Sequence, residues 1–186
     1  MSGLASSHNR GDASADSLNS AEGQFNAFMV WLHQQTEAGS KDYEGRTLTP
    51  EDRNEIKSRI TELYGVPVDG GLMPPDSCTY HALKNNGRIA SLKIQDWDRF
   101  ACYLATFARQ RKKGCEHLPL RCNTADRYLS AIKQDLITHG YNNSQNSPLD
   151  DAAKTKKVRD GMWKIFIERH RKEGMYILSL GLYLLC

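Results

Sequence analysis

The sequence predicts an all-α protein, a small bundle of helices, and three observations support this fold class. In five segments, apolar side chains recur at the three- and four-residue spacing of one helix face. No segment alternates apolar and polar residues as a half-buried strand does. The chain of 186 residues is 39% hydrophobic, so it can bury a core. We expect one domain of ordinary size, or one domain with a long appendage.

The chain is expected to begin with a disordered leader, residues 1–18. This leader consists mainly of Ser, Ala, Gly, Asp and Asn and holds almost nothing to bury that would offset the entropy cost of ordering it. Asn19 and Glu22 have the spacing of a capping box, which predicts a first helix over about 20–37. Its apolar face would consist of Phe25, Phe28, Met29 and Leu32.

A second helix is predicted to begin at Thr49, because Pro50 suits a first turn and Asp52 stands three residues after the cap. Its apolar stripe would consist of Ile56, Ile60 and Leu63. The residues that follow, 65–77, are rich in Gly and Pro and show no helical period. They are interpreted as a linker and as the boundary between two parts of the chain.

Three further helices complete the predicted bundle. The third covers about 94–112 and ends in the cations of segment 109–113. Thr124 is the expected N-cap of the fourth, which would end before Gly140, and the fifth covers about 150–172. Their apolar faces would consist of Trp97, Phe100, Leu104 and Phe107, then Ala125, Tyr128, Leu129, Ile132 and Leu136, then Val158, Met162, Ile165 and Phe166.

Charge is distributed unevenly along the chain. Residues 1–70 hold 6 basic and 11 acidic side chains, whereas residues 71–186 hold 19 and 11. The acidic helical pair, 19–64, is interpreted as an accessory domain or as a cover over the basic part, 78–174. A polyanion would bind the basic part.

No motif for catalysis or for a cofactor stands out. The glycines near residue 70 follow no strand and precede no Lys-Ser/Thr pair, so a phosphate-binding loop is not supported. Zinc could be held by Cys78 and His81 with Cys115, His117 and Cys122, but these spacings differ from those of common zinc fingers. We therefore expect no metal, no cofactor and no small-molecule substrate.

The sequence also indicates an intracellular protein. It contains no apolar run of membrane-spanning length, and its first twenty residues lack the apolar stretch of a signal peptide. Its five cysteines are odd in number and irregularly spaced, which favours reduced thiols. We expect the nucleus in a eukaryote and the cytoplasm otherwise.

Basic residues recur along three successive helices whose opposite faces are apolar. Packing of the apolar faces could gather the cations on a shared exterior, where they would neutralise nucleic-acid phosphates and release counterions. The alternative is a solvated face without a partner, which is what most runs of charge are.

One stretch resembles a known family. The pattern begins with Thr124-Ala-Asp-Arg-Tyr-Leu-Ser-Ala-Ile-Lys133, continues with Gly140 and Pro148, and ends with Val158-Arg-Asp-Gly-Met-Trp-Lys164. It resembles the SAM-like, N-terminal core-binding domain of tyrosine recombinases, the phage-integrase class, over about residues 78–174. Gly161 lies inside a predicted helix, where glycine is unfavourable by about 1 kcal/mol, and is interpreted as a site of close backbone approach.

The resemblance implies a helical module that forms half of a clamp around duplex DNA. In that family, catalysis belongs to a following domain that carries two Arg, a Lys, a His-x-x-Arg box and a nucleophilic Tyr. The chain ends before such a domain could start, so we expect no enzyme, and Tyr128 is interpreted as a core residue. The apolar tail, 175–186, is interpreted as the product of a truncated reading frame, or as an arm that packs on the bundle.

The predicted function is thus duplex DNA binding, mainly through backbone phosphates, by the core-binding part of a recombinase-like protein from a mobile element. The resemblance places eight cations near DNA: Lys84, Arg88, Arg127, Lys133, Lys156, Lys157, Arg159 and Lys164. Self-association is left open, and no membrane partner is expected. The alternative function is a helical protein-interaction module whose partner binds the acidic helices and the apolar tail.

Overall fold

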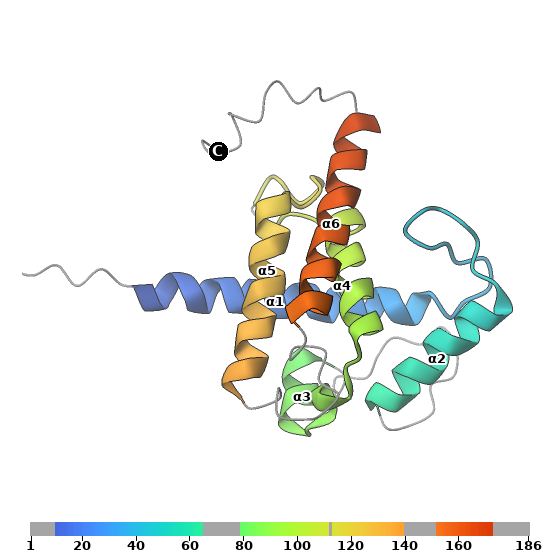
Figure 1. Ribbon diagram of the computed structural model, residues 1–186, viewed down its shortest axis with the longest axis horizontal. Coiled ribbons are helices and arrows are strands. Elements are labelled where there is room, and N and C mark those ends of the chain that lie inside the picture. The colour runs from blue at the N-terminus through green and yellow to red at the C-terminus, as the bar shows by residue number, and fades with distance from the viewer. Residues whose placement is uncertain (1–9, 65–78, 112, 140–151, 173–186) are drawn as a thin grey trace, which may run out of the picture.

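A computed structural model describes residues 10–64, 79–111, 113–139 and 152–172 of the chain. Within these residues the secondary structure is helical, with two isolated β-bridges and no strand. The elements are α1 (Arg10–Gln34), α2 (Pro50–Tyr64), α3 (Tyr80–Asn85), the short 3-10 helix η2 (Arg88–Ser91), α4 (Ile94–Thr106), α5 (Cys122–Thr138) and α6 (Ala152–Lys172) (Figure 1). The predicted all-α bundle is confirmed.

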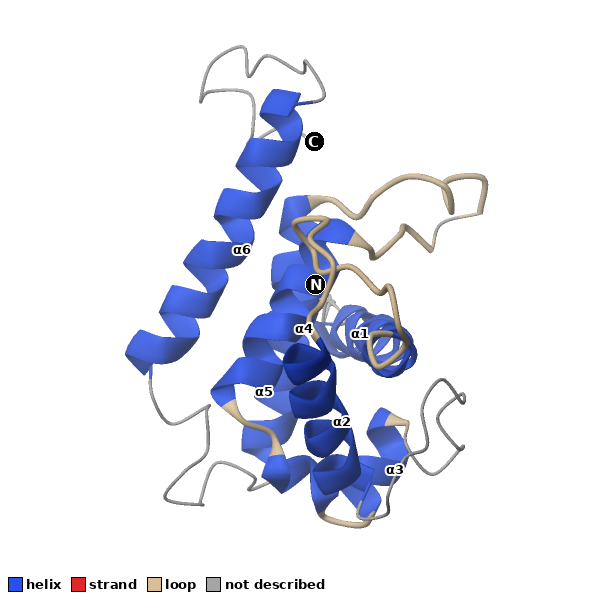
Figure 2. Ribbon diagram, turned by 90° about the vertical axis from the view of Figure 1, so that its right-hand side faces the viewer, coloured by secondary structure: helices blue, strands red, loops and turns tan. Residues whose placement is uncertain are grey.

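The helices form three layers. In Figure 1, α4, α5 and α6 run in roughly the same direction, with α1 crossing behind them. In Figure 2, α4 and α5 lie between α6 and α1, which agrees with the packing of α6 on α4 and of α1 on α5. α2 and α3 lie toward one end of this stack. α6 therefore forms an outer layer, with one face packed on the bundle and the other face open.

One hydrophobic core joins the acidic and basic parts of the chain. The Phe25 ring of α1 packs edge-on against Tyr80 and Phe100, with ring centroids 5.2 Å apart in each case. The same core cluster includes Ile60 of α2 and Phe166 of α6. The acidic helices α1 and α2 thus share one core with the basic part of the chain, and the predicted division of the chain into units stays a prediction. The predicted linker, 65–77, lies outside the described residues.

Helix α1 begins at Arg10, about ten residues earlier than predicted. The predicted leader is thus helical over residues 10–18, and Asn19 and Glu22 lie inside the helix, where they cannot cap it. Extending an existing helix fixes one residue for one additional hydrogen bond, so a polar segment next to a packed helix can continue it. Residues 1–9 and the apolar tail lie outside the described part of the chain.

Helix α2 begins where the sequence predicts. The backbone N–H of Asp52 donates to the Thr49 hydroxyl at 3.1 Å, and the backbone N–H of Thr49 donates to the Asp52 carboxylate at 3.0 Å. This reciprocal cap satisfies two N–H groups that the first turn leaves open.

The short helices α3 and η2 were not predicted. The hydroxyl of Thr79 caps α3 by accepting from the N–H of Ala82 at 3.3 Å. Gly87, with a φ of 74°, makes the turn into η2. Elements of six and four residues are too short to show an apolar period.

Helix α4 ends at Thr106 and not at residue 112. Beyond it, the N–H of Gln110 donates to Leu118 O and the N–H of Leu120 donates to Ala108 O, both at 3.0 Å. The cations of segment 109–113 that the structure describes therefore lie in a hairpin-like loop and not in a last helical turn. The last carbonyls of α4 find another cation, because Nη1 of Arg169 in α6 donates to Ala105 O at 2.6 Å.

The last two helices keep their predicted cores with different ends. Arg121, and not Thr124, is the N-cap of α5, and its side chain makes no capping hydrogen bond. Helix α6 is described from Ala152, so Gly140 and Pro148 lie outside the described residues. Tyr128 is buried, as predicted.

The close backbone approach predicted at Gly161 is wrong. A Cβ atom at this position would meet nothing within 4 Å. Gly23 of α1 is the glycine with a close neighbour, because the Arg111 guanidinium lies where its Cβ would be. Among the helices that the structure describes, none is long and apolar enough to cross a membrane.

Candidate nucleic-acid interface

Helix α6 carries a strong excess of positive charge. Its 21 residues include eight Lys and Arg side chains and two carboxylates. The side chains of Val158, Met162 and Phe166 are buried against the bundle. Successive residues are about 100° apart around a helix, so Lys157 and Lys164 lie on the opposite face. Both are exposed, which makes this open face of α6 cationic.

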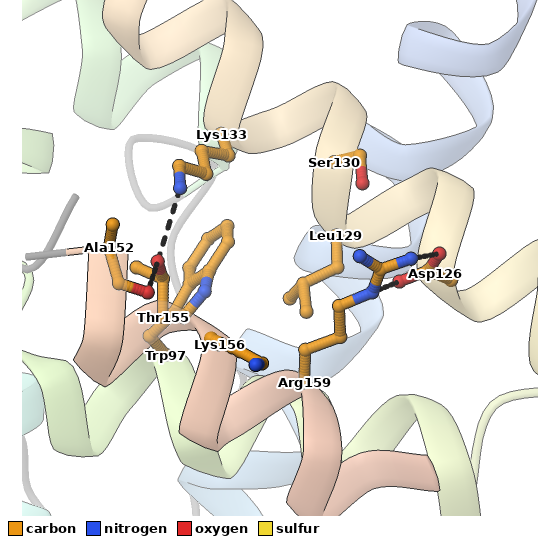
Figure 3. Close-up of a pocket in the computed structure, with 9 residues that line it drawn as sticks. All are labelled: Trp97, Asp126, Leu129, Ser130, Lys133, Ala152, Thr155, Lys156 and Arg159. Carbon is orange, nitrogen blue, oxygen red and sulfur yellow. Dashed lines mark hydrogen bonds and ion pairs between the residues drawn. The ribbon is translucent and has the colours of Figure 1, made fainter.

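A groove separates α6 from α5, with a volume of about 230 Å³ (Figure 3). Both helices contribute side chains at the same i, i+3, i+4, i+7 spacing. The indole of Trp97, from α4, is almost completely buried beneath the groove. The lining consists of Trp97, Asp126, Leu129, Ser130, Lys133, Ala152, Thr155, Lys156 and Arg159.

Three cations and one carboxylate line this groove. The Lys133 ammonium donates to the Thr155 hydroxyl at 3.2 Å. Arg159 holds Asp126 through two parallel bonds, from Nε to Oδ1 and from Nη2 to Oδ2, each 2.5 Å long. The hydrogen bond to Asp126 raises the pKa of Arg159 above its usual value, so this guanidinium stays charged. The groove therefore has a net positive charge.

Five of the eight predicted cations gather on this side of the molecule. Lys133, Lys156 and Arg159 line the groove, and Lys157 and Lys164 belong to the open face of α6. Arg127 is also exposed on α5, but it lies about 100° around the helix from Asp126 and does not line the groove. Within the described chain, Lys156, Lys157 and Lys164 form no ion pair.

The other two predicted cations lie elsewhere. Arg88 is exposed on η2, which packs on α2 and α3. The Lys84 ammonium forms an ion pair with Asp135 at 2.7 Å, and its side chain is only 13% exposed. Sequence reasoning treated both as part of a basic stretch before α4, but the unpredicted α3 places Lys84 against α5.

The Asp135 carboxylate is the centre of a polar cluster that joins α3 to α5. It accepts hydrogen bonds from the Tyr80 hydroxyl and the Lys84 ammonium, both at 2.7 Å. The His139 ring also lies close, with Nδ1 3.2 Å from Oδ1. Burial works to raise the pKa of Asp135, but the bonds from Lys84 and Tyr80 outweigh it and hold the pKa below its usual value. An ionised aspartate with these donors is a structural connection between helices.

Sequence reasoning missed the polar residues that shape the groove, chiefly Asp126, Ser130 and Thr155. Asp126, Ser130 and Lys133 share one side of α5, and Ala152, Thr155, Lys156 and Arg159 share one side of α6. This spacing is visible in the sequence. Only the packing shows that these two sides face each other.

The structure shows no metal site among the residues that it describes. No three His, Cys, Asp or Glu side chains there could hold a metal ion together. Cys122 and Cys102 are buried, and burial raises the pKa of each thiol to about 12, which opposes the thiolate form that zinc binds. Cys78 lies outside the described residues.

No protein-family model, no curated protein and no solved structure matches this chain.

Proposed function

We propose that the protein binds the phosphate backbone of duplex DNA through α6 and the groove between α5 and α6. One observation carries this proposal: α6 holds eight cations and two carboxylates, and three of its exposed lysines form no ion pair in the described chain. These are Lys156, Lys157 and Lys164. The groove adds Lys133 and Arg159 beside them.

The physical basis is the release of counterions. Each phosphate that a lysine or arginine neutralises frees condensed cations from the duplex, which gives affinity without reading the sequence. An outer helix with one packed and one open face can lie against a duplex without disturbing the core. In this proposal the protein acts as the DNA-holding part of a recombinase-like system, in keeping with the resemblance to core-binding domains, and it performs no strand cleavage.

The experiment is fluorescence anisotropy of the full chain with a random duplex of about 30 base pairs at several salt concentrations. The test variant replaces Lys156, Lys157 and Lys164 with Gln. The matched control removes three cations outside this surface, Lys41, Lys57 and Lys113, also with Gln. If each test lysine contacts one phosphate, the slope of log affinity against log salt falls by about 2.7 in the test variant. The control keeps the slope of the unmodified protein.

Two results would overturn the proposal. The first is no binding by the unmodified protein at low salt. The second is an equal loss in the test and control variants, which would show only an effect of total charge. The first result would favour the alternative, a protein-interaction module, whose apolar contacts would be nearly indifferent to salt. The second would show that DNA binding does not depend on this surface.

A further inference from the structure

Arg159 differs from the other cations of this surface because a neighbouring side chain holds it in place. Its Nε and Nη2 atoms donate to the two oxygens of Asp126, and each of these hydrogen bonds is 2.5 Å long. The planar guanidinium fits a carboxylate in this two-bond geometry, which fixes its direction as well as its position. A lysine ammonium has no comparable restraint.

The remaining nitrogen of this guanidinium is available to a ligand. In the described chain no hydrogen bond is recorded from Nη1, and the Arg159 side chain is 54% exposed. Figure 3 shows this nitrogen on the side of the guanidinium away from Asp126, toward the groove that Leu129 and Lys133 also line. The Asp126 side chain is only 18% exposed, so it holds Arg159 from within the protein.

The rest of the groove suits an anion. The ammonium groups of Lys133 and Lys156 supply charge, and the Ser130 hydroxyl supplies a further donor. The floor of the groove is the apolar Trp97, and one wall includes Leu129. Apolar walls have a low dielectric constant, which strengthens the electric field of the cations.

We propose that the groove holds one phosphate group, with Arg159 as its principal ligand and Asp126 as the residue that positions Arg159. This inference rests on the proposed function when the phosphate belongs to a DNA backbone. A free phosphate ion presents the same oxygens, so the two sources need separate measurements. The remaining cations of α6 contact other phosphates of the same duplex.

The main test compares two substitutions that remove the same negative charge, Asp126→Asn and Asp160→Asn. Asp160 is exposed on α6, and its charge also acts on Arg159, but it forms no ion pair in the described chain, so its substitution removes a neighbouring negative charge without removing the partner that holds the guanidinium. If Asp126 positions Arg159, the D126N variant binds DNA less tightly than the unmodified protein, by about 5-fold, and its salt slope falls by about 0.9, the value for one phosphate. The D160N variant binds at least as tightly as the unmodified protein. Equal strengthening by both substitutions would overturn the proposal.

Two further variants separate positioning from folding. Arg159→Lys keeps the charge and loses the fork, so it weakens binding to a similar extent. Asp126→Glu keeps the carboxylate and recovers part of the affinity that D126N loses. Thermal unfolding of each variant checks that the helices remain folded, and full affinity in R159K would contradict the inference.

Inorganic phosphate tests the site without DNA. At constant ionic strength, added phosphate raises the unfolding temperature of the unmodified protein and of D160N more than chloride does, and it has a smaller effect on D126N and R159K. If the unmodified protein fails to bind DNA but shows this shift, the proposed function falls and the phosphate site stands. The opposite outcome has two parts: the unmodified protein binds DNA, and phosphate shifts the unfolding temperatures of all four proteins equally while D126N binds DNA as tightly as D160N. In that case the proposed function stands and the phosphate site falls.

Discussion

At the scale of single residues, a glycine is required only where a side chain would not fit. Gly161, interpreted from the sequence as a site of close backbone approach, is not such a position. The position is helical, and a Cβ atom there would meet open space. Nothing in the described structure therefore requires glycine at this point. At Gly23, by contrast, the missing side chain leaves room for the Arg111 guanidinium, which brings the loop after α4 against α1.

We predict that Gly161→Ala stabilises the protein, by about 0.8–1 kcal/mol, because alanine loses less backbone entropy in a helix than glycine. The measurement is urea unfolding followed by circular dichroism. The matched control is Gly39→Ala, which also meets open space but has a φ of 83°. The left-handed conformation costs an alanine roughly 1–2 kcal/mol, so the control lowers stability. Loss of stability in G161A would show that this glycine has a partner.

At the scale of whole elements, the long helices could be predicted from the sequence, but several of their ends could not. The apolar periods of α2, α4, α5 and α6 locate their buried faces, and the Thr49 and Asp52 pair locates the start of α2. The ends depend on distant contacts. Helix α4 stops at Thr106, and the carbonyl of Ala105 in its last turn accepts a hydrogen bond from Arg169, 64 residues further along the chain, a contact that no local pattern contains.

The same limit applies to the candidate site. The sequence shows that α6 is basic and that Lys133, Lys156 and Arg159 are cations. It does not show that Asp126 meets Arg159, because this pairing depends on how α5 and α6 are rotated against each other. Lys84 shows the opposite error, because the sequence predicted it as a DNA-binding cation and the structure pairs it with Asp135. The pairing depends on the short helix α3, which has no visible apolar period.

The ion pair between Arg59 of α2 and Asp96 of α4 makes the packing of these two helices testable. Nη2 of Arg59 donates to Oδ2 of Asp96 at 2.5 Å and to Ser91 O at 3.0 Å. The Asp96 side chain is fully buried. Burial works to lower the pKa of Arg59, but the hydrogen bonds to Asp96 outweigh it and raise the pKa. The Arg59 guanidinium is therefore charged in the folded protein.

We predict that Arg59→Met destabilises the protein by about 3–5 kcal/mol, because it removes the guanidinium that donates to the buried Asp96 carboxylate and leaves only the Arg99 guanidinium, 3.9 Å away, as a countercharge in the described chain. Arg46→Met is the control. Arg46 also pairs with carboxylates, but its side chain is 70% exposed, so its loss should lower stability much less than the loss of Arg59 does. Urea unfolding measures both. Similar small losses in the two variants would show that α2 is only loosely attached to the bundle.

At the scale of the whole molecule, the acidic and basic parts of the chain share one hydrophobic core. The acidic first part of the chain supplies Phe25, Phe28 and Leu32 to the centre of the core, while the basic second part supplies the outer layer α6. The acidic part of the chain thus contributes to the core, and the excess of positive charge lies on the outer helix α6. For this reason the binding experiments need the full chain, since a fragment without α1 would lack these core side chains.

A single core predicts that a cavity in α1 weakens helices far along the chain. Phe28 is completely buried and contacts the rings of Phe100 and Tyr103 in α4. We expect Phe28→Ala to lower the free energy of unfolding by about 3–5 kcal/mol.

Amide hydrogen exchange, read by mass spectrometry, should show faster exchange in protected peptides of α2, α4 and α5 as well as in α1, because all of these amides are exposed by one cooperative unfolding. Ile167→Ala, at a half-exposed position of α6, is the control and should change exchange little. If the loss of protection in F28A stops at residue 64, the acidic helices unfold as a separate unit. If it extends through α5, the two oppositely charged parts of the sequence depend on each other for their fold.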